Sequence, residues 1–251
     1  MKSLEEIKIE LIWTDNITEK AKNDFIKVQN EVFNSNFNEK KFHRKYIKNI
    51  YGPSIIVLAY KEKCCVGARA FWRNDINDLK AYQPCDTGVL SEYRGYGIFK
   101  KMTYGALELI DDNTLIYNFP NDNSYSGYLK MGWKLYNKKK YKIYNPFKDY
   151  NLVDRVEKKY LSWMLDGLDF NKSLYYTCIM SSYYLIKRRK GNLYVIIGKI
   201  DEESTFHLHK AKLPICLIYS EQGYFGRGLV TVTRNFKTDI HIPLYKLDTL
   251  F

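Results

Sequence analysis

A glycine-bearing turn between a predicted strand and a predicted helix restricts the fold of this chain most. The run 81–89 is predicted to form a strand, and the turn from Arg94 to Gly97 follows it. Apolar residues then recur at helical spacing over 98–110. The first N–H groups of a helix have no intrahelical partner, and its dipole favours anions. The turn therefore predicts a site for a pyrophosphate, although ordinary capping loops share the pattern.

The runs around this turn alternate in the order of a mixed α/β domain. The predicted elements are a strand at 7–13, helices at 18–33 and 39–47, a hairpin of strands 54–60 and 65–72, a strand at 81–89, a helix at 98–110, a strand at 115–119, a helix at 125–131, and strands at 133–136 and 141–144.

The pattern changes past Pro146, where we place a domain boundary at 146–152. The second part is predicted to contain a helix at 154–165 and strands at 183–186, 193–200, 213–219 and 228–232. The sequence thus predicts domains at 1–147 and 148–251. A second domain that is a decayed copy of the first is an alternative, but no clear sequence repeat supports it.

Composition excludes several classes of protein. With 45% hydrophobic and 27% charged residues, the chain is predicted to fold rather than to be disordered. Its charged first residues lack a signal-peptide core, and no window approaches a membrane span. Five cysteines without CxxC spacing suggest neither a disulfide framework nor a zinc site, so a cytoplasmic location is expected. His207 and His209 alternate on a predicted strand face without further ligands, so no metal is predicted.

A net charge of +12 favours phosphate-bearing partners, either nucleic acid or small molecules. The basic runs 138–140 and 187–190 are interleaved with tyrosine and apolar residues rather than forming a long basic arm. This arrangement favours a small phosphorylated molecule over nucleic acid, although such runs are often only solvated faces.

A second motif about thirty residues after the glycine turn makes the pattern specific. Asn121, Tyr128, Gly132 and Trp133 form N-x6-Y-x3-G-[FW], and the earlier R-x-x-G-x lies at 94–98. In this element order the pair resembles the Gcn5-related N-acetyltransferase (GNAT) superfamily, which transfers an acyl group from coenzyme A to an amine. The resemblance covers residues 1 to about 145. It implies a GNAT fold with a mixed, mostly antiparallel sheet flanked by helices, followed by a smaller degenerate GNAT-like α/β domain that completes the acceptor cleft.

The resemblance also implies roles for individual residues. Main-chain amides at 94–100 would hold the coenzyme A diphosphate, the strand end at Val89 would pair with the pantetheine arm, and Asn121 would bind pantetheine. Tyr128 would protonate the departing thiolate, and the N–H near Val89, where two strands are expected to separate, would stabilise the oxyanion. The predicted cofactor-binding residues are Thr87, Gly88, Val89, Arg94, Gly95, Tyr96, Gly97, Ile98, Phe99, Lys100 and Asn121.

Phe99 departs from the family, which usually has glycine or alanine there. Because the contacts at this position come from N–H groups, coenzyme A binding is expected to survive, with the ring reshaping the adenine side. Direct transfer without a covalent enzyme species is expected, since Cys85 has no evident activating neighbour and is interpreted as a packed strand residue.

The general base is left open. Some family members use a glutamate at the position of Gln83, and glutamine cannot accept the proton. The remaining candidates are Asp86, Asp75, Glu92, His43 or a chain of water molecules.

The acceptor is suggested by the run 118–125, which is similar to two-domain bacterial members that acylate nucleotide-linked (dTDP or UDP) amino sugars for surface polysaccharides. The implied donor is acetyl-CoA or a short hydroxyacyl-CoA such as 3-hydroxybutanoyl-CoA. Two alternatives stand: an N-acetyltransferase for protein, peptide or small amines, and a non-catalytic acyl-CoA-binding or nucleic-acid-binding module. Retention of Asn121 and Tyr128 argues against the last. Nothing in the sequence predicts the oligomeric state.

Overall fold

The computed structural model describes residues 7–166, 173–235 and 240–247. The chain divides into two compact units. Among the described residues, unit 1 contains 7–134 together with 232–235, and unit 2 contains 135–166, 173–231 and 240–247. The last residues of the strand 225–234 therefore complete the first unit.

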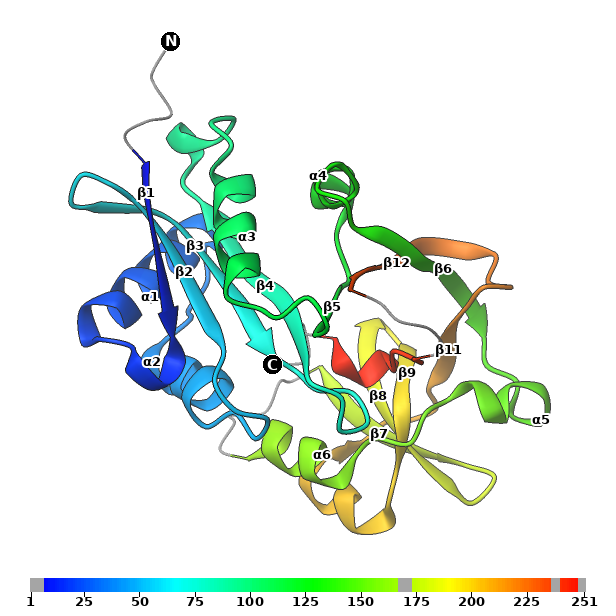
Figure 1. Ribbon diagram of the computed structural model, residues 1–251. Helices are drawn as coiled ribbons and strands as arrows, with labels where there is room; N and C mark the ends of the chain where they lie inside the picture. The colour runs from blue at the N-terminus through cyan, green and yellow to red at the C-terminus, as the bar shows by residue number, and fades with distance from the viewer. Residues whose placement is uncertain (1–6, 167–172, 236–239, 248–251) are drawn as a thin grey trace. The chain divides into compact units, whose positions relative to one another are not determined.

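Unit 1 is built on a sheet in the order β1-β2-β3-β4-β5-β12, antiparallel except for the parallel pair β4–β5. Its elements are β1 (Ile7–Trp13), α1 (Glu19–Phe33), α2 (Glu39–Phe42) with a π-helical turn (His43–Ile47), β2 (Ile55–Lys61), β3 (Cys64–Arg73), β4 (Ala81–Val89), α3 (Ile98–Glu108), β5 (Leu115–Asn118), α4 (Asp122–Lys130) and the end of β12 (Phe225–Arg234). In Figure 1, α1 and α2 lie on one face of β1–β4, and α3 lies on the other. This arrangement confirms the predicted GNAT fold.

Local sequence explains how the helices are fixed to this sheet. Thr18 caps α1, because its Oγ1 accepts a hydrogen bond of 3.2 Å from the N–H of Ala21. The buried face of α1 carries Phe25 and Val28. A Cβ on Gly88 would lie 3.2 Å from atoms of Val32, so glycine allows α1 to pack closely on β4.

Strands β4 and β5 separate soon after they meet. Their register pairs Ala81 with Leu115 and Tyr82 with Ile116, whereas β4 continues to Val89. The edge of β4 beyond Tyr82 is thus not paired to β5. The expected separation of these two strands is confirmed, and it occurs just before a bulge at Asp86, whose φ is 44°.

Unit 2 contains a sheet in the order β6-β11-β9-β8-β7-β10. Its elements are β6 (Lys134–Ile143), α5 (Pro146–Asp149), α6 (Lys158–Leu165), β7 (Leu174–Ile179), β8 (Ser182–Lys190), β9 (Leu193–Ile200), β10 (His209–Lys210), β11 (Ile215–Ser220) and the beginning of β12. A buried apolar cluster that includes Tyr184, Ile186, Ile196 and Ile218 forms a core.

Several predicted elements need correction. Residues 134–143 form one strand instead of two, because residues 137–140, between the two predicted strands, contain no glycine or proline that would end a strand. Helix α4 begins at Asp122, three residues before the predicted start, because Asn121 caps it. Strand β7 was not predicted. His207 ends a 3-10 turn and His209 belongs to β10, so the two histidines do not share a strand face. The assignment of functional domains to 1–147 and 148–251 stays a prediction.

Candidate active site

The glycine turn delivers a helix N-terminus with unpaired amides. Gly95 and Gly97 have φ of 83° and 73°, a left-handed conformation that glycine adopts without strain. The N–H of Lys101 donates to the carbonyl of Gly97 over 3.0 Å. The N–H groups of residues 98–100 therefore precede the first intrahelical bond of α3 and point out of its end. A Cβ at Gly95 would meet nothing within 4 Å, so this turn is open to a ligand.

Close packing fixes this helix end beside the end of β4. A Cβ on Gly67 would lie 3.2 Å from the Cγ2 of Ile98, and Gly67 is paired with Val89. The Nε of Arg94 also donates to the carbonyl of Val89 over 3.0 Å. The first turn of α3 and the last residue of β4 thus belong to one local structure.

The amide of Val89 faces the side from which β5 has departed. The N–H of Leu90 donates to the carbonyl of Val66 on β3 over 3.0 Å. Because successive amides of a strand point in opposite directions, the N–H of Val89 points away from β3. This is the geometry that strand-like pairing with an extended ligand requires.

Tyr128 lies at the centre of a buried polar cluster. Its side chain comes from α4 and is 2% exposed. The Nη2 of Arg69 and the Nδ2 of Asn118 each donate to its hydroxyl oxygen over 2.6 Å. Asn118 is itself oriented, because its Oδ1 accepts a hydrogen bond of 2.8 Å from the N–H of Phe119. Arg69 and Asn118 both act as donors here, so neither of these two bonds uses the proton of Tyr128.

Register places this cluster where β4 leaves β5. On β3, Ala68 pairs with Gly88 and Ala70 pairs with Cys85, so Arg69 lies opposite the bulge of β4. Asn118 is the last residue of β5. The hydroxyl of Tyr128 therefore connects β3 and β5 beside the unpaired stretch of β4.

Phe99 packs against this cluster, and the expected effect of its ring on the adenine side of a coenzyme stays a prediction. The ring packs edge-on against Tyr128, with centroids 5.6 Å apart, and the guanidinium carbon of Arg69 lies 4.6 Å from its centroid. A Cβ at Gly127 would be 3.5 Å from Cε1 of this ring, an ordinary contact distance, so α4 lies directly against the ring. The half-buried Phe99 thus packs between α3 and α4.

Three predicted coenzyme-binding residues have structural contacts within the protein. The Oδ1 of Asn121 accepts a hydrogen bond of 3.0 Å from the N–H of Ser124 and so caps α4, while the residue is exposed. The hydroxyl of Thr87 donates to the carbonyl of Cys85 over 3.3 Å. Gly88 faces α1, as described above. Coenzyme binding by these residues stays a prediction.

The candidate bases differ in their surroundings. Gln83 is buried and accepts a hydrogen bond of 3.0 Å from Asn74. Asp75 is paired with Arg73 and also accepts from the N–H of Ala81. Glu92 and His43 are exposed. Of these four residues, Gln83 alone lies on the unpaired stretch of β4, and its side chain is not a carboxylate.

Asp86, on the bulge of β4, is held by two residues of the π-helical turn. The Nζ of Lys45 lies 2.9 Å from its Oδ2, and the hydroxyl of Tyr46 donates to the same oxygen. Burial, and then the charge of Asp86, raises the pKa of Tyr46 well above its ordinary value. About a quarter of the Asp86 side chain is exposed, which leaves this carboxylate accessible. Among the residues proposed as bases, it is the one at the bulge.

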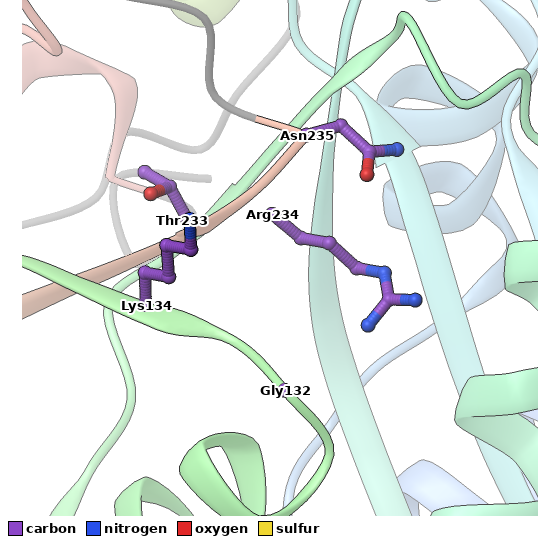
Figure 2. Close-up of a pocket in the computed structure, with 5 residues that line it drawn as sticks. All are labelled: Gly132, Lys134, Thr233, Arg234 and Asn235. Carbon is purple, nitrogen blue, oxygen red and sulfur yellow. The ribbon is translucent and has the colours of Figure 1, made fainter.

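A separate pocket of about 340 Å³ in unit 1 is lined by Gly132, Lys134, Thr233, Arg234 and Asn235. Figure 2 shows the side chains of Lys134 and Arg234 coming from the two different strands that border it. An Nη1 donor of Arg234 is bonded to the carbonyl of Met131 over 3.0 Å. None of the predicted site residues lines this pocket.

Within the described parts of the chain, no group of three His, Cys, Asp or Glu side chains is placed to hold a metal ion. No helix there is long and apolar enough to cross a membrane.

Residues 14–136 match the family model of the acetyltransferase (GNAT) domain. No curated protein matches the sequence. Three solved structures share the fold over most of the chain: a GCN5-related N-acetyltransferase from Kribbella flavida (12% identity, 92% of this chain and 72% of that one, TM-score 0.53), a candidate acetyltransferase from Pyrococcus horikoshii (12%, 92% and 90%, 0.53), and a conserved Enterococcus faecalis V583 protein (13%, 91% and 72%, 0.51).

Residues 14–136 therefore form a GNAT acetyltransferase domain. The class of enzyme is an N-acyltransferase that uses acyl-CoA as its co-substrate.

Sequence reasoning missed three members of the Tyr128 cluster. Arg69 stands alone as a charge in the apolar stretch 66–72, which was the available signal. Asn118 was read only as part of the acceptor-related run. Thr103, which accepts a hydrogen bond of 2.8 Å from Nη1 of Arg69, carries no motif at all.

Proposed function

We propose that this protein transfers an acetyl or short hydroxyacyl group, such as 3-hydroxybutanoyl, from acyl-CoA to the amino group of a nucleotide-linked amino sugar. The observation that carries the reaction is the position of the Tyr128 hydroxyl. It lies 2.6 Å from donors on β3 and β5, beside the stretch of β4 that has no β5 partner. An acyl-CoA whose diphosphate lies at the N-terminus of α3 would run along this stretch.

In the proposed reaction the neutral amine attacks the thioester carbonyl carbon. The N–H of Val89 stabilises the oxyanion of the tetrahedral intermediate. The C–S bond then breaks, an amide forms, and the thiolate of coenzyme A takes the proton of Tyr128. The proton lost by the amine passes to a base, for which Asp86 at the bulge is the best-placed carboxylate, or to water. Solvent returns a proton to Tyr128.

Charge supports an acceptor that carries phosphate. The chain has a net charge of +12, and a donor and an acceptor that both carry diphosphates would be attracted by it. The run 118–125, similar to enzymes for nucleotide-linked amino sugars, contains Asn118, which binds Tyr128 directly. The proposed acceptor chemistry thus rests on charge and on that resemblance.

Mass spectrometry tests the proposal. Purified protein is incubated with acetyl-CoA or 3-hydroxybutanoyl-CoA and a panel of dTDP- and UDP-linked amino sugars, and the mass gained by each acceptor is measured. We expect one acceptor to gain one acyl group. Coenzyme A binding without any acylated sugar, together with acylation of a peptide or polyamine in a parallel panel, would overturn the sugar acceptor and leave the enzyme class intact.

A further inference from the structure

We propose that Arg69 is a positioning residue that holds the Tyr128 hydroxyl in place and stabilises its ionised form, so that Tyr128 gives up its proton readily. The inference rests on the proposed acid role of Tyr128. It concerns a residue outside both sequence motifs.

Arg69 is a buried cation that forms no ion pair with an acidic side chain among the described residues. The residue is 0% exposed, and burial lowers the pKa of its guanidinium while the Tyr128 hydroxyl acts in the opposite direction. Within the described chain its hydrogen-bond partners are the hydroxyls of Tyr128 and Thr103, and its Nε has none. A buried charge normally requires an opposite charge nearby. Here that opposite charge arises when Tyr128 loses its proton.

Aromatic faces provide the rest of the environment of this cation. The guanidinium carbon lies 5.1 Å from the ring centroid of Phe71, 4.6 Å from that of Phe99 and 5.5 Å from that of Tyr128. Cation–π contacts of this kind accommodate a guanidinium without neutralising it. The charge therefore stays available to act on the one hydroxyl that the guanidinium and Asn118 both contact.

The chemistry of the leaving group shows why this matters. A free tyrosine ionises near pH 10 and a free thiol near pH 8.5. The equilibrium for transfer of a proton from an ordinary tyrosine to a thiolate is therefore unfavourable by roughly thirtyfold. A cation at hydrogen-bond distance of the phenol oxygen favours the phenolate. Arg69 thus makes proton transfer from Tyr128 to the thiolate less unfavourable.

Titration of Tyr128 by NMR tests the inference without any acceptor. The protein is labelled with ¹³C at the tyrosine Cζ, and the Tyr128 signal is assigned by its loss in Tyr128→Phe. In Arg69→Gln, which has no charge at this position, the Tyr128 midpoint should move up by about one pH unit or more. In Arg69→Lys, which keeps the charge, it should stay close to that of the wild type. Thr103→Val, which removes the other hydroxyl bonded to Arg69 and keeps the charge of Arg69, is the matched control and should not move it.

Equal Tyr128 midpoints in the wild type and a folded Arg69→Gln overturn the inference. Should Arg69→Gln not fold, the wild-type spectrum decides: Tyr128 must titrate below Tyr46, whose hydroxyl contacts the carboxylate of Asp86. A Tyr128 signal that titrates with or above Tyr46 contradicts the inference. Failure of the acid role of Tyr128 is measured separately: the Tyr128→Phe variant would then produce free coenzyme A at the wild-type rate. That outcome would leave the Arg69 titration result unchanged.

Discussion

Two buried cations lie near the bulge of β4, each over aromatic rings, but among the described residues only Lys45 is paired with a carboxylate. Lys45 is 5% exposed, and its Nζ lies 2.9 Å from the carboxylate of Asp86. Arg69 is 0% exposed, and its partners are two hydroxyls and three aromatic rings. Lys45 belongs to the π-helical turn after α2, whereas Arg69 faces α3 and α4. The first cation is neutralised, and the second keeps its charge beside Tyr128.

The difference indicates that the two cations have different roles, Lys45 in stability and Arg69 in the chemistry of Tyr128. A salt bridge between partly buried groups fixes the π-helical turn to β4, and its loss leaves an unpaired charge in the interior. A cation without a carboxylate contributes less to stability, but it can act on an ionising neighbour. We therefore expect stability to depend more on the Lys45–Asp86 pair and catalysis to depend more on the Tyr128 cluster.

The largest expected effect is on turnover, in Tyr128→Phe. Removal of the hydroxyl takes away the acid, and kcat should fall by about 10²-fold or more. Coenzyme A binding, measured by calorimetry, should stay near that of the wild type, because the amides of α3 are unchanged. Tyr104→Phe on the exposed side of α3 is the control and should keep full activity. Normal turnover in Tyr128→Phe would remove this tyrosine from the mechanism.

Stability should respond most to Asp86→Asn. Asparagine tolerates the positive φ at this position, so the substitution mainly removes the charge opposite Lys45. The free energy of unfolding should fall by about 2 kcal/mol, less than for a fully buried pair because Asp86 is about a quarter exposed. Urea denaturation measures this.

Two matched variants sharpen the same test. The double variant Lys45→Met with Asp86→Asn should recover much of the loss, because no unpaired charge is left. Arg69→Met should change the free energy of unfolding by about 1 kcal/mol or less, since no carboxylate loses its partner. An Arg69→Met variant less stable than Asp86→Asn would show that the two cations do not differ as described.

A smaller effect is expected from Phe99→Leu. Leucine keeps an apolar side chain between α3 and α4 but removes the ring face 4.6 Å from the guanidinium carbon of Arg69. The protein should lose about 1 kcal/mol of stability and keep coenzyme A binding. Weakened coenzyme A binding at unchanged stability would instead return Phe99 to the coenzyme site.

The fold of unit 1 could be predicted because its signals are local. Period-two runs, the Thr18 cap and the Gly95–Gly97 turn each act within a few residues. The separation of β4 and β5 was expected from the family resemblance. By contrast, the contact of Arg69 with Tyr128 joins residues 59 positions apart, and no local pattern encodes it. The same holds for the contact between the rings of Phe99 and Tyr128, which come from two different helices.

The smallest expected effect concerns alkaline pH and Tyr46. Burial and Asp86 raise the pKa of Tyr46 in the folded protein above the value of roughly 10 in the unfolded chain. The folded state therefore holds this proton more tightly, so its contribution to stability is complete below pH 10 and decreases as the pH rises further. In Tyr46→Phe the fall should be shallower, and the stability difference between the two proteins should shrink by less than about 1 kcal/mol at half a pH unit above 10. Urea denaturation at pH 9 and 10.5 measures it, and parallel curves for the two proteins would show that Tyr46 ionises normally beside the Lys45–Asp86 pair.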